Sequence, residues 1–136
     1  MKTHADYRYL IIEDEAPVRD FVASALRKMG ATHIDLAENG ALALDILDSG
    51  KQPDIIICDL YMPQLDGVKF LRHLAMDQFN GGVILMSGST GSILGMAAKM
   101  AETYHLNILG ALSKPFTPAA LEALLISFAE KQKQSA

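Results

Sequence analysis

The chain has 136 residues, enough for one domain with its own hydrophobic core but too few for a second. Of its residues, 50% are hydrophobic and 21% are charged, a balance that is typical of folded proteins and excludes a disordered or collagen-like chain. The formal net charge of -4, with no long basic run, lacks the electrostatic surface that non-specific nucleic-acid binding requires. We therefore expect no direct nucleic-acid partner.

The apolar runs of the sequence are far shorter than the ~20 residues that a membrane-spanning helix needs. The polar start of the chain does not resemble a signal peptide, so we expect a cytoplasmic protein without a membrane partner. The single cysteine, Cys58, cannot form a disulfide within the chain, and its apolar neighbours predict a small buried side chain.

Short apolar runs predict five strands, at residues 9–12, 33–37, 55–58, 83–86 and 108–112, of which the second has the weakest signal. Between and after them, apolar residues recur at helical spacing, and a further helix is expected at about residues 92–104. The helical patterns consist of Val18, Phe21, Val22, Ala25, Leu26 and Met29; of Ala41, Leu44, Ile46 and Leu47; of Val68, Leu71, Leu74 and Ala75; and of Leu121, Leu124, Leu125 and Phe128.

Glycines stand where these helical patterns stop, and we expect Gly30, Gly50 and the pair Gly81 and Gly82 to end helices. The alternation of strands and helices predicts an open parallel sheet with helices on both faces, because parallel strands need crossover connections. We expect one α/β domain at residues 8–130, with an N-terminal extension at residues 1–7 and a polar tail or the start of a linker at residues 131–136.

Polar residues follow four of the predicted strands at the point where each strand ends. Glu13 and Asp14 follow the first strand, Asp59 the third, Ser87 the fourth and Lys114 the fifth. Because open parallel sheets bind ligands at the carboxyl ends of their strands, we expect these side chains to converge. Three carboxylates in one pocket repel each other unless a cation neutralises them, and Mg²⁺ prefers such oxygen ligands. The sequence therefore predicts a magnesium site.

Asp59 is the candidate nucleophile of this site, able to form an acyl phosphate. Lys114 would supply a positive charge and Ser87 a hydroxyl donor to the phosphoryl oxygens, since phosphoryl transfer needs mainly positioning and neutralisation of charge. Each residue alone has an ordinary explanation; Asp14 or Glu15, for example, can begin the next helix. Their joint occurrence at four strand ends favours a phosphoryl-transfer site.

Four segments carry these residues in an order and spacing that resemble the receiver domains of two-component response regulators: LIIEDEAPVR, IIICDLYMPQLDG, VILMSGS and ALSKPF. The resemblance covers about residues 8–130 and implies a flavodoxin-like, doubly wound (βα)5 fold with a five-stranded sheet in the order 2-1-3-4-5. It also implies that the main-chain carbonyl of Tyr61 is a further ligand of Mg²⁺ and that the peptide bond before Pro115 is often cis.

The function that the resemblance implies is a phosphorylation switch. A sensor histidine kinase or a histidine phosphotransfer protein would phosphorylate Asp59 in the presence of Mg²⁺. The domain would catalyse only its own phosphorylation and slow autodephosphorylation, and would not be an enzyme for another substrate. An output domain, a target protein or a second copy of the chain would then read the changed surface.

Ala111 departs from the pattern of these receiver domains, which commonly carry an aromatic residue three positions before the lysine. That aromatic side chain moves inward with the hydroxyl residue, so the usual coupling to Ser87 cannot operate here. We expect the signal to pass through the loop after Ser87 or through the helix that follows. Met96 and Met100 of this helix are expected to pack into the core, with a partner-binding surface as the alternative.

Two other classes of protein fit the sequence poorly. A phosphatase of the haloacid-dehalogenase type needs a second aspartate where Tyr61 stands, and a flavodoxin-like cofactor binder needs a Ser/Thr-rich phosphate loop where the chain is acidic. Two alternatives stay open. One is a constitutive interaction module that is never phosphorylated; the other is the receiver fragment of a regulator with a cyclic-dinucleotide phosphodiesterase output, which residues 108–112 faintly resemble.

Overall fold

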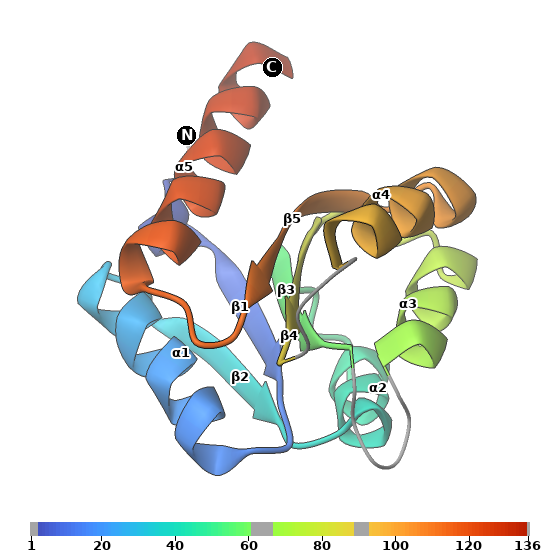
Figure 1. Cartoon of the computed structure of the whole chain (residues 1–136), viewed down its shortest axis with the longest axis horizontal. Helices are drawn as coiled ribbons and strands as arrows, with labels where there is room; N and C mark the ends of the chain where they lie inside the picture. Colours follow the sequence, from blue (N-terminus) through green and yellow to red (C-terminus); the bar gives the residue numbers. More distant parts are fainter. Residues whose placement is uncertain (1–2, 61–66, 89–92, 136) are drawn as a thin grey trace.

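The computed structural model describes residues 3–60, 67–88 and 93–135. Five parallel strands form one sheet in the order β2-β1-β3-β4-β5, which confirms the expected flavodoxin-like topology (Figure 1). Each strand begins and ends within about one residue of its predicted range. The strands are β1 (Arg8–Ile12), β2 (His33–Ala37), β3 (Ile55–Asp59), β4 (Gly82–Ser87) and β5 (Asn107–Ser113).

Helices cover both faces of the sheet (Figure 1). On one face lie α1 (Ala16–Lys28) and α5 (Pro118–Ser135), and on the other lie α2 (Gly40–Asp48), α3 (Gly67–Met76) and α4 (Ile93–Tyr104). The two faces have separate cores because successive side chains of a strand point in opposite directions. In β3, for example, Ile55 and Ile57 join the core under α1 and α5, whereas Ile56 and Cys58 join the other.

Strand position explains why some strands are easier to predict than others. Every residue of β3 and β4 is buried, because both strands lie inside the sheet with helices on each side, and such strands have continuous apolar runs. In contrast, β2 lies at the edge of the sheet and leaves Leu36 40% exposed. Its weaker apolar signal reflects this exposure.

Two of the three predicted helix ends are confirmed by left-handed glycines, with φ angles of 99° at Gly30 after α1 and 96° at Gly50 after α2. The prediction for Gly81 and Gly82 is wrong. Helix α3 ends well before them, and Gln78, with a φ angle of 57°, has the left-handed conformation instead. The absence of a side chain at Gly81 serves packing, since a Cβ atom there would lie 2.5 Å from a main-chain oxygen of the segment before β3.

The N-terminal segment packs on α5. A short 3-10 turn, η1 (His4–Asp6), contacts this helix, and the rings of Tyr7 and Phe128 meet edge to face with centroids 5.5 Å apart. Helix α5 continues to Ser135 and extends past the end of the sheet (Figure 1). It is the longest helix, and neither it nor any other helix in the described part of the chain has the length and apolar character needed to cross a membrane.

Candidate functional site

The residues singled out from the sequence lie at the carboxyl edge of the sheet. Glu13 directly follows β1, Asp59 and Ser87 are the last residues of β3 and β4, and Lys114 directly follows β5. The N–H of Lys114 donates a hydrogen bond to the carbonyl oxygen of Ser87 at 2.8 Å, which ties the ends of β4 and β5 together. The convergence expected from the parallel topology is therefore present.

Three carboxylates form the centre of the site. Each of Glu13, Asp14 and Asp59 offers a carboxylate oxygen, and these oxygens lie within 4.8 Å of one another. Glu13 and Asp59 are buried, while Asp14 is exposed. Carboxylates this close repel each other, and a set of anionic oxygen donors is the environment that Mg²⁺ prefers. The residues present thus fit a Mg²⁺ ion.

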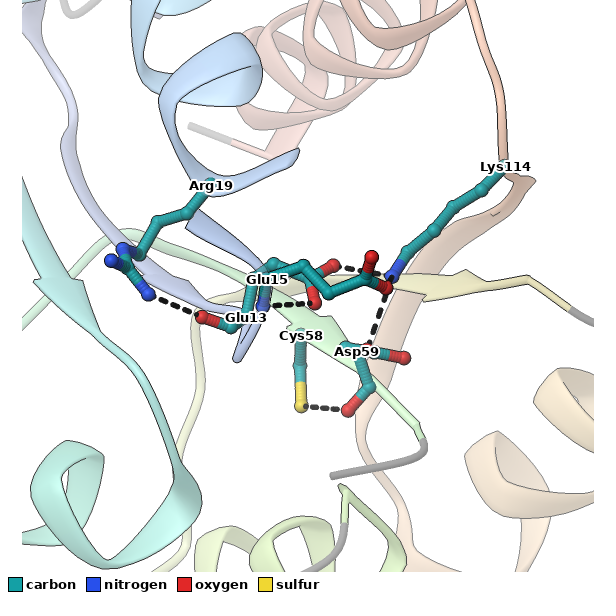
Figure 2. A network of polar contacts seen from close by, with 6 residues as sticks. All are labelled: Glu13, Glu15, Arg19, Cys58, Asp59 and Lys114. Atoms are coloured by element: carbon teal, nitrogen blue, oxygen red, sulfur yellow. Dashed lines mark hydrogen bonds and ion pairs between the residues drawn. The ribbon is translucent and has the colours of Figure 1, made fainter. Parts of the chain in front are cut away.

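Lys114 is the cation of the site (Figure 2). Its Nζ forms an ion pair with Glu13, lies 3.1 Å from Oδ2 of Asp59 and is 3.9 Å from Oε1 of Glu15. Burial alone would lower the pKa of this ammonium group, but the contacts with Glu13 and Asp59 outweigh burial and raise the pKa of Lys114. The side chain therefore provides a permanent positive charge beside the carboxylate of Asp59.

Hydrogen bonds hold Glu13 on three sides. Its N–H donates to the carbonyl oxygen of Ala37 at 3.0 Å, and its own carbonyl oxygen accepts from Nη1 of Arg19 at 2.9 Å. Its carboxylate accepts from the N–H of Glu15 at 3.2 Å (Figure 2). The first residue after β1 is thus fixed through both its main chain and its side chain.

The ionisation of Glu13 is strongly affected by its surroundings. Burial raises the pKa of Glu13 to about 7; Asp14 and Asp59 also raise it, while the hydrogen bonds from Lys114 and the N–H of Glu15 act in the opposite direction. A carboxyl group with this pKa is partly protonated near neutral pH. A bound divalent cation would favour the ionised form.

A groove of about 430 Å³ adjoins the site, between the start of α1 and the segment after β5. Lys114 lies among its lining residues, and the peptide bond between Lys114 and Pro115 is cis, as the resemblance implies. The walls are mainly apolar. Phe21, which is 40% exposed, meets Phe116 edge to face with ring centroids 5.7 Å apart, and Pro17 and Val18 line the same groove.

Other sequence predictions have different outcomes. The main-chain carbonyl of Tyr61 and the side chain of Met96 lie outside the described residues, so their assignments stay predictions. Met100 is buried in the core under α2, α3 and α4, as expected. Ala111, the position at which the resemblance leads us to expect an aromatic residue, pairs with Leu85 and packs against the same core.

Sequence reasoning missed two contacts at the site. One is the hydrogen bond from Arg19 to the carbonyl oxygen of Glu13, and the other is the ion pair between Glu15 and Lys114. Glu15 begins α1 as expected of an acidic residue there, although its side chain makes no capping hydrogen bond. The signal that could have identified Arg19 is its charge, since a cation in the first turn of a helix opposes the helix dipole. Such a residue indicates a contact outside the helix.

The chain matches the family described as response regulator receiver domain over residues 9–126. It is 37% identical to the cyclic di-GMP phosphodiesterase RocR of Pseudomonas aeruginosa, over 90% of this chain and 31% of that protein. It is 33% identical to the response regulator Rre1 of Synechocystis sp., over 93% of this chain and 53% of that protein. The chain thus spans about a third to a half of these relatives.

Solved structures support the same fold. The signal receiver domain of an HD domain-containing protein from Pseudomonas fluorescens superposes with a TM-score of 0.78 at 23% identity, covering 93% of this chain and 97% of that one. The chemotaxis protein CheY4 of Vibrio cholerae superposes with a TM-score of 0.75 at 23% identity, covering 89% and 97%. With the family match over most of its length, the chain belongs to the receiver domains of two-component response regulators.

Proposed function

We propose that Asp59 is the phosphoacceptor of a signalling switch and receives its phosphoryl group from a phosphohistidine of a partner protein. The observation that supports this most strongly is the site geometry. The oxygens of Glu13, Asp14 and Asp59 lie within 4.8 Å of one another, and the Lys114 Nζ lies 3.1 Å from Oδ2 of Asp59. Mg²⁺ would be held by these three carboxylates and by the main-chain carbonyl of Tyr61.

The reaction is a displacement at phosphorus. A carboxylate oxygen of Asp59 attacks the phosphorus atom, an O–P bond forms, and the P–N bond to the donor imidazole breaks. The imidazole nitrogen keeps the electron pair of that bond. Later attack by water on phosphorus releases inorganic phosphate and regenerates the Asp59 carboxylate, which is the slow autodephosphorylation expected of this domain.

In our proposal, two side chains besides Asp59 contact the phosphoryl group itself. Lys114, already paired with Asp59, would contact an oxygen of the phosphoryl group, and the hydroxyl of Ser87 would donate to another. A bound Mg²⁺ ion supplies further positive charge to the phosphoryl oxygens. Glu13 and Asp14 would hold that ion from the end of β1. Together these contacts would stabilise the charge of the transferred group.

The groove beside Lys114 suits the protein that carries the donor histidine. Its walls, from Pro17, Val18, Phe21 and Phe116, are mainly apolar and open beside the acceptor pocket. An apolar helix face of a histidine kinase or a phosphotransfer protein would fit this surface, because a helix docks by burying its apolar side in such a groove. The donor imidazole would then approach Asp59 from the side of Lys114.

The test uses a small phosphoryl donor in place of the partner. Incubation of the protein with acetyl phosphate and Mg²⁺ should add the mass of one phosphoryl group, measured on the intact chain by mass spectrometry. Asp59→Asn should abolish the gain, because an amide oxygen is a poor nucleophile. Asp45→Asn is the matched control, since Asp45 is an exposed aspartate of α2 that does not belong to the carboxylate cluster, and it should keep the gain.

The alternative of a constitutive interaction module makes the opposite prediction. Ala111, which lacks the side chain of the usual aromatic relay, is the observation that favours it. Beryllium fluoride mimics a phosphoryl group without needing chemical transfer. If acetyl phosphate with Mg²⁺ adds no phosphoryl group and beryllium fluoride with Mg²⁺ does not bind, the switch proposal is wrong and the constitutive module is favoured.

The similarity to RocR favours a second proposal about the longer protein. RocR is named a cyclic di-GMP phosphodiesterase, and this chain aligns with 31% of it at 37% identity. We propose that the receiver regulates an output domain of the same activity. The product of the full reading frame should then hydrolyse cyclic di-GMP at a rate that changes after treatment with acetyl phosphate. Absence of hydrolysis in both states would contradict this second proposal.

A further inference from the structure

We infer that Arg19 is a positioning residue for the metal site, which it controls through the peptide group that joins Glu13 to Asp14; this inference rests on the proposed function. Nη1 of Arg19 donates to the carbonyl oxygen of that peptide group at 2.9 Å. The contact is with the main chain and not with a carboxylate. Arg19 therefore acts on the path of the loop that carries two metal ligands.

The place of Asp14 in this loop shows what the contact achieves. Asp14 is exposed, so packing contributes little to the orientation of its carboxylate. Its position depends on the two peptide groups that flank it. The carbonyl of the preceding one is held by Arg19, and the N–H of the following one is held by the carboxylate of Glu13 at 3.2 Å. Loss of Arg19 would release one of these two supports.

The sheet does not provide this support itself. Glu13 follows the last residue of β1, and its N–H still reaches the carbonyl oxygen of Ala37 at the end of β2. The carbonyl of Glu13 lies beyond both strand ends, so a donor must come from elsewhere. Arg19 provides it from the opposite side of Glu13 to Lys114, as Figure 2 shows.

The identity of the residue is also informative, because Arg19 lies in the first turn of α1. The positive end of the helix dipole lies there, and a cation at this place is unfavourable for the helix. A residue that opposes its own helix but completes a neighbouring site is expected to serve that site. The guanidinium group also offers several donors in a rigid plane, which suits a fixed contact with a carbonyl oxygen.

The test compares Mg²⁺ binding among four proteins by isothermal titration calorimetry, in the unphosphorylated state. Arg19→Met should raise the Kd for Mg²⁺ about 10- to 100-fold, the range found when groups that orient metal ligands are removed. Arg19→Lys keeps the charge but loses the planar guanidinium group, and its Kd for Mg²⁺ should lie between those of Arg19→Met and wild type. Arg27→Met removes the same charge from an exposed site in the last turn of α1 and should bind as wild type does.

A second readout separates positioning of the metal from a general structural defect. In the reaction with acetyl phosphate, Arg19→Met should be slow at low Mg²⁺ but return to within about twofold of the wild-type rate at saturating Mg²⁺. A rate that is reduced equally at all Mg²⁺ concentrations would overturn the inference. If Arg19→Met does not fold, as judged by urea unfolding, Arg19→Lys decides by the same two measurements.

The outcomes also distinguish this inference from the proposed function. A wild-type protein that binds no Mg²⁺ would overturn both. A wild-type protein that binds Mg²⁺ and is phosphorylated, with Arg19 variants that bind Mg²⁺ equally tightly, would overturn only the role of Arg19.

Discussion

At Glu13, burial and charge act against each other. Its side chain is completely buried, it is paired with Lys114, and two further carboxylates are close by. A metal ligand must be ionised, whereas burial favours the protonated form and raises the pKa of Glu13 to about 7. Protons and a divalent cation therefore compete for the same oxygen atoms within the pH range of ordinary experiments.

The affinity for Mg²⁺ should accordingly depend on pH. Because Glu13 must lose its proton before it can bind the ion, the Kd should rise about tenfold between pH 8 and pH 6. Calorimetric titration at several pH values measures this directly. Asp14→Asn should bind Mg²⁺ more weakly, but its Kd should change with pH as in wild type. Glu13→Gln should bind Mg²⁺ weakly, with a Kd that changes little with pH. If the Kd for Mg²⁺ changed equally with pH in wild type and in Glu13→Gln, Glu13 would not be the group that titrates.

The same pKa affects the stability of the metal-free protein. The pKa of Glu13 rises from the ordinary value of 4.5 to about 7 on folding, so between these pH values the folded state binds more protons here than the unfolded state. The stabilising contribution of this group is fully present below pH 4.5 and is lost as the pH rises through about 7. As the pH rises from 4.5 to about 7, the free energy of unfolding of Glu13→Gln, measured with urea, should fall less than that of wild type. An equal fall in both proteins would show that Glu13 is not the cause.

The connection from α3 to β4 illustrates how an element is placed by a close approach of two main chains. A Cβ atom at Gly81 would lie 2.5 Å from the carbonyl oxygen of Asp54 and equally close to the ring of Phe79. The next residue, Gly82, donates its N–H to the same carbonyl oxygen at 2.9 Å. The start of β4, and with it the strand that ends in Ser87, thus depends on a residue without a side chain.

Gly81→Ala should therefore destabilise the protein by about 1–3 kcal/mol, the usual cost of forcing extra atoms into a packed region. The main-chain oxygen of Asp54 cannot move away as the end of a flexible side chain could. Gly95→Ala is the matched control, because Gly95 is exposed in α4 and has open space around its Cα atom. There alanine should stabilise the helix by about 0.5–1 kcal/mol. Urea unfolding of both variants measures the two effects, and a change of the same sign would refute the explanation.

Local patterns and strand order are the features that sequence reasoning predicted correctly. The apolar runs of β3 and β4 are continuous because both strands are buried on each side, and the approach of Lys114 to Asp59 follows from the order of the strands. The role of Gly81 could not be found in the same way, since its close neighbour Asp54 belongs to another part of the chain. The contact of Arg19 depends on the direction of one side chain, which spacing does not reveal.

At the scale of the whole molecule, the site joins segments that are distant in the sequence. Glu13 follows β1, Asp59 ends β3 and Lys114 follows β5, so the side chain of Lys114 reaches past the end of β4 to Asp59 and on to Glu13. From this edge, a short segment joins Lys114 to α5 on one face, whereas Ala111 packs against the core on the other. Ala111 has no aromatic side chain to move, and a route from Asp59 to a helix is instead its ion pair with Lys114, followed by the short segment that joins Lys114 to α5.

A bound ion should stabilise the whole fold, because the unfolded chain cannot bring the ends of β1 and β3 together to bind it. At a free Mg²⁺ concentration of 100 times its Kd, the free energy of unfolding should rise by about 2.7 kcal/mol. Urea unfolding with and without Mg²⁺, at constant ionic strength, measures the gain. Asp45→Asn on the exposed side of α2 should keep it, and Asp14→Asn should lose most of it at the same Mg²⁺ concentration. Of these two aspartates, Asp14 belongs to the carboxylate cluster at the ends of β1 and β3 and Asp45 does not. An equal gain in stability in both variants would therefore mean that Mg²⁺ acts elsewhere on the protein.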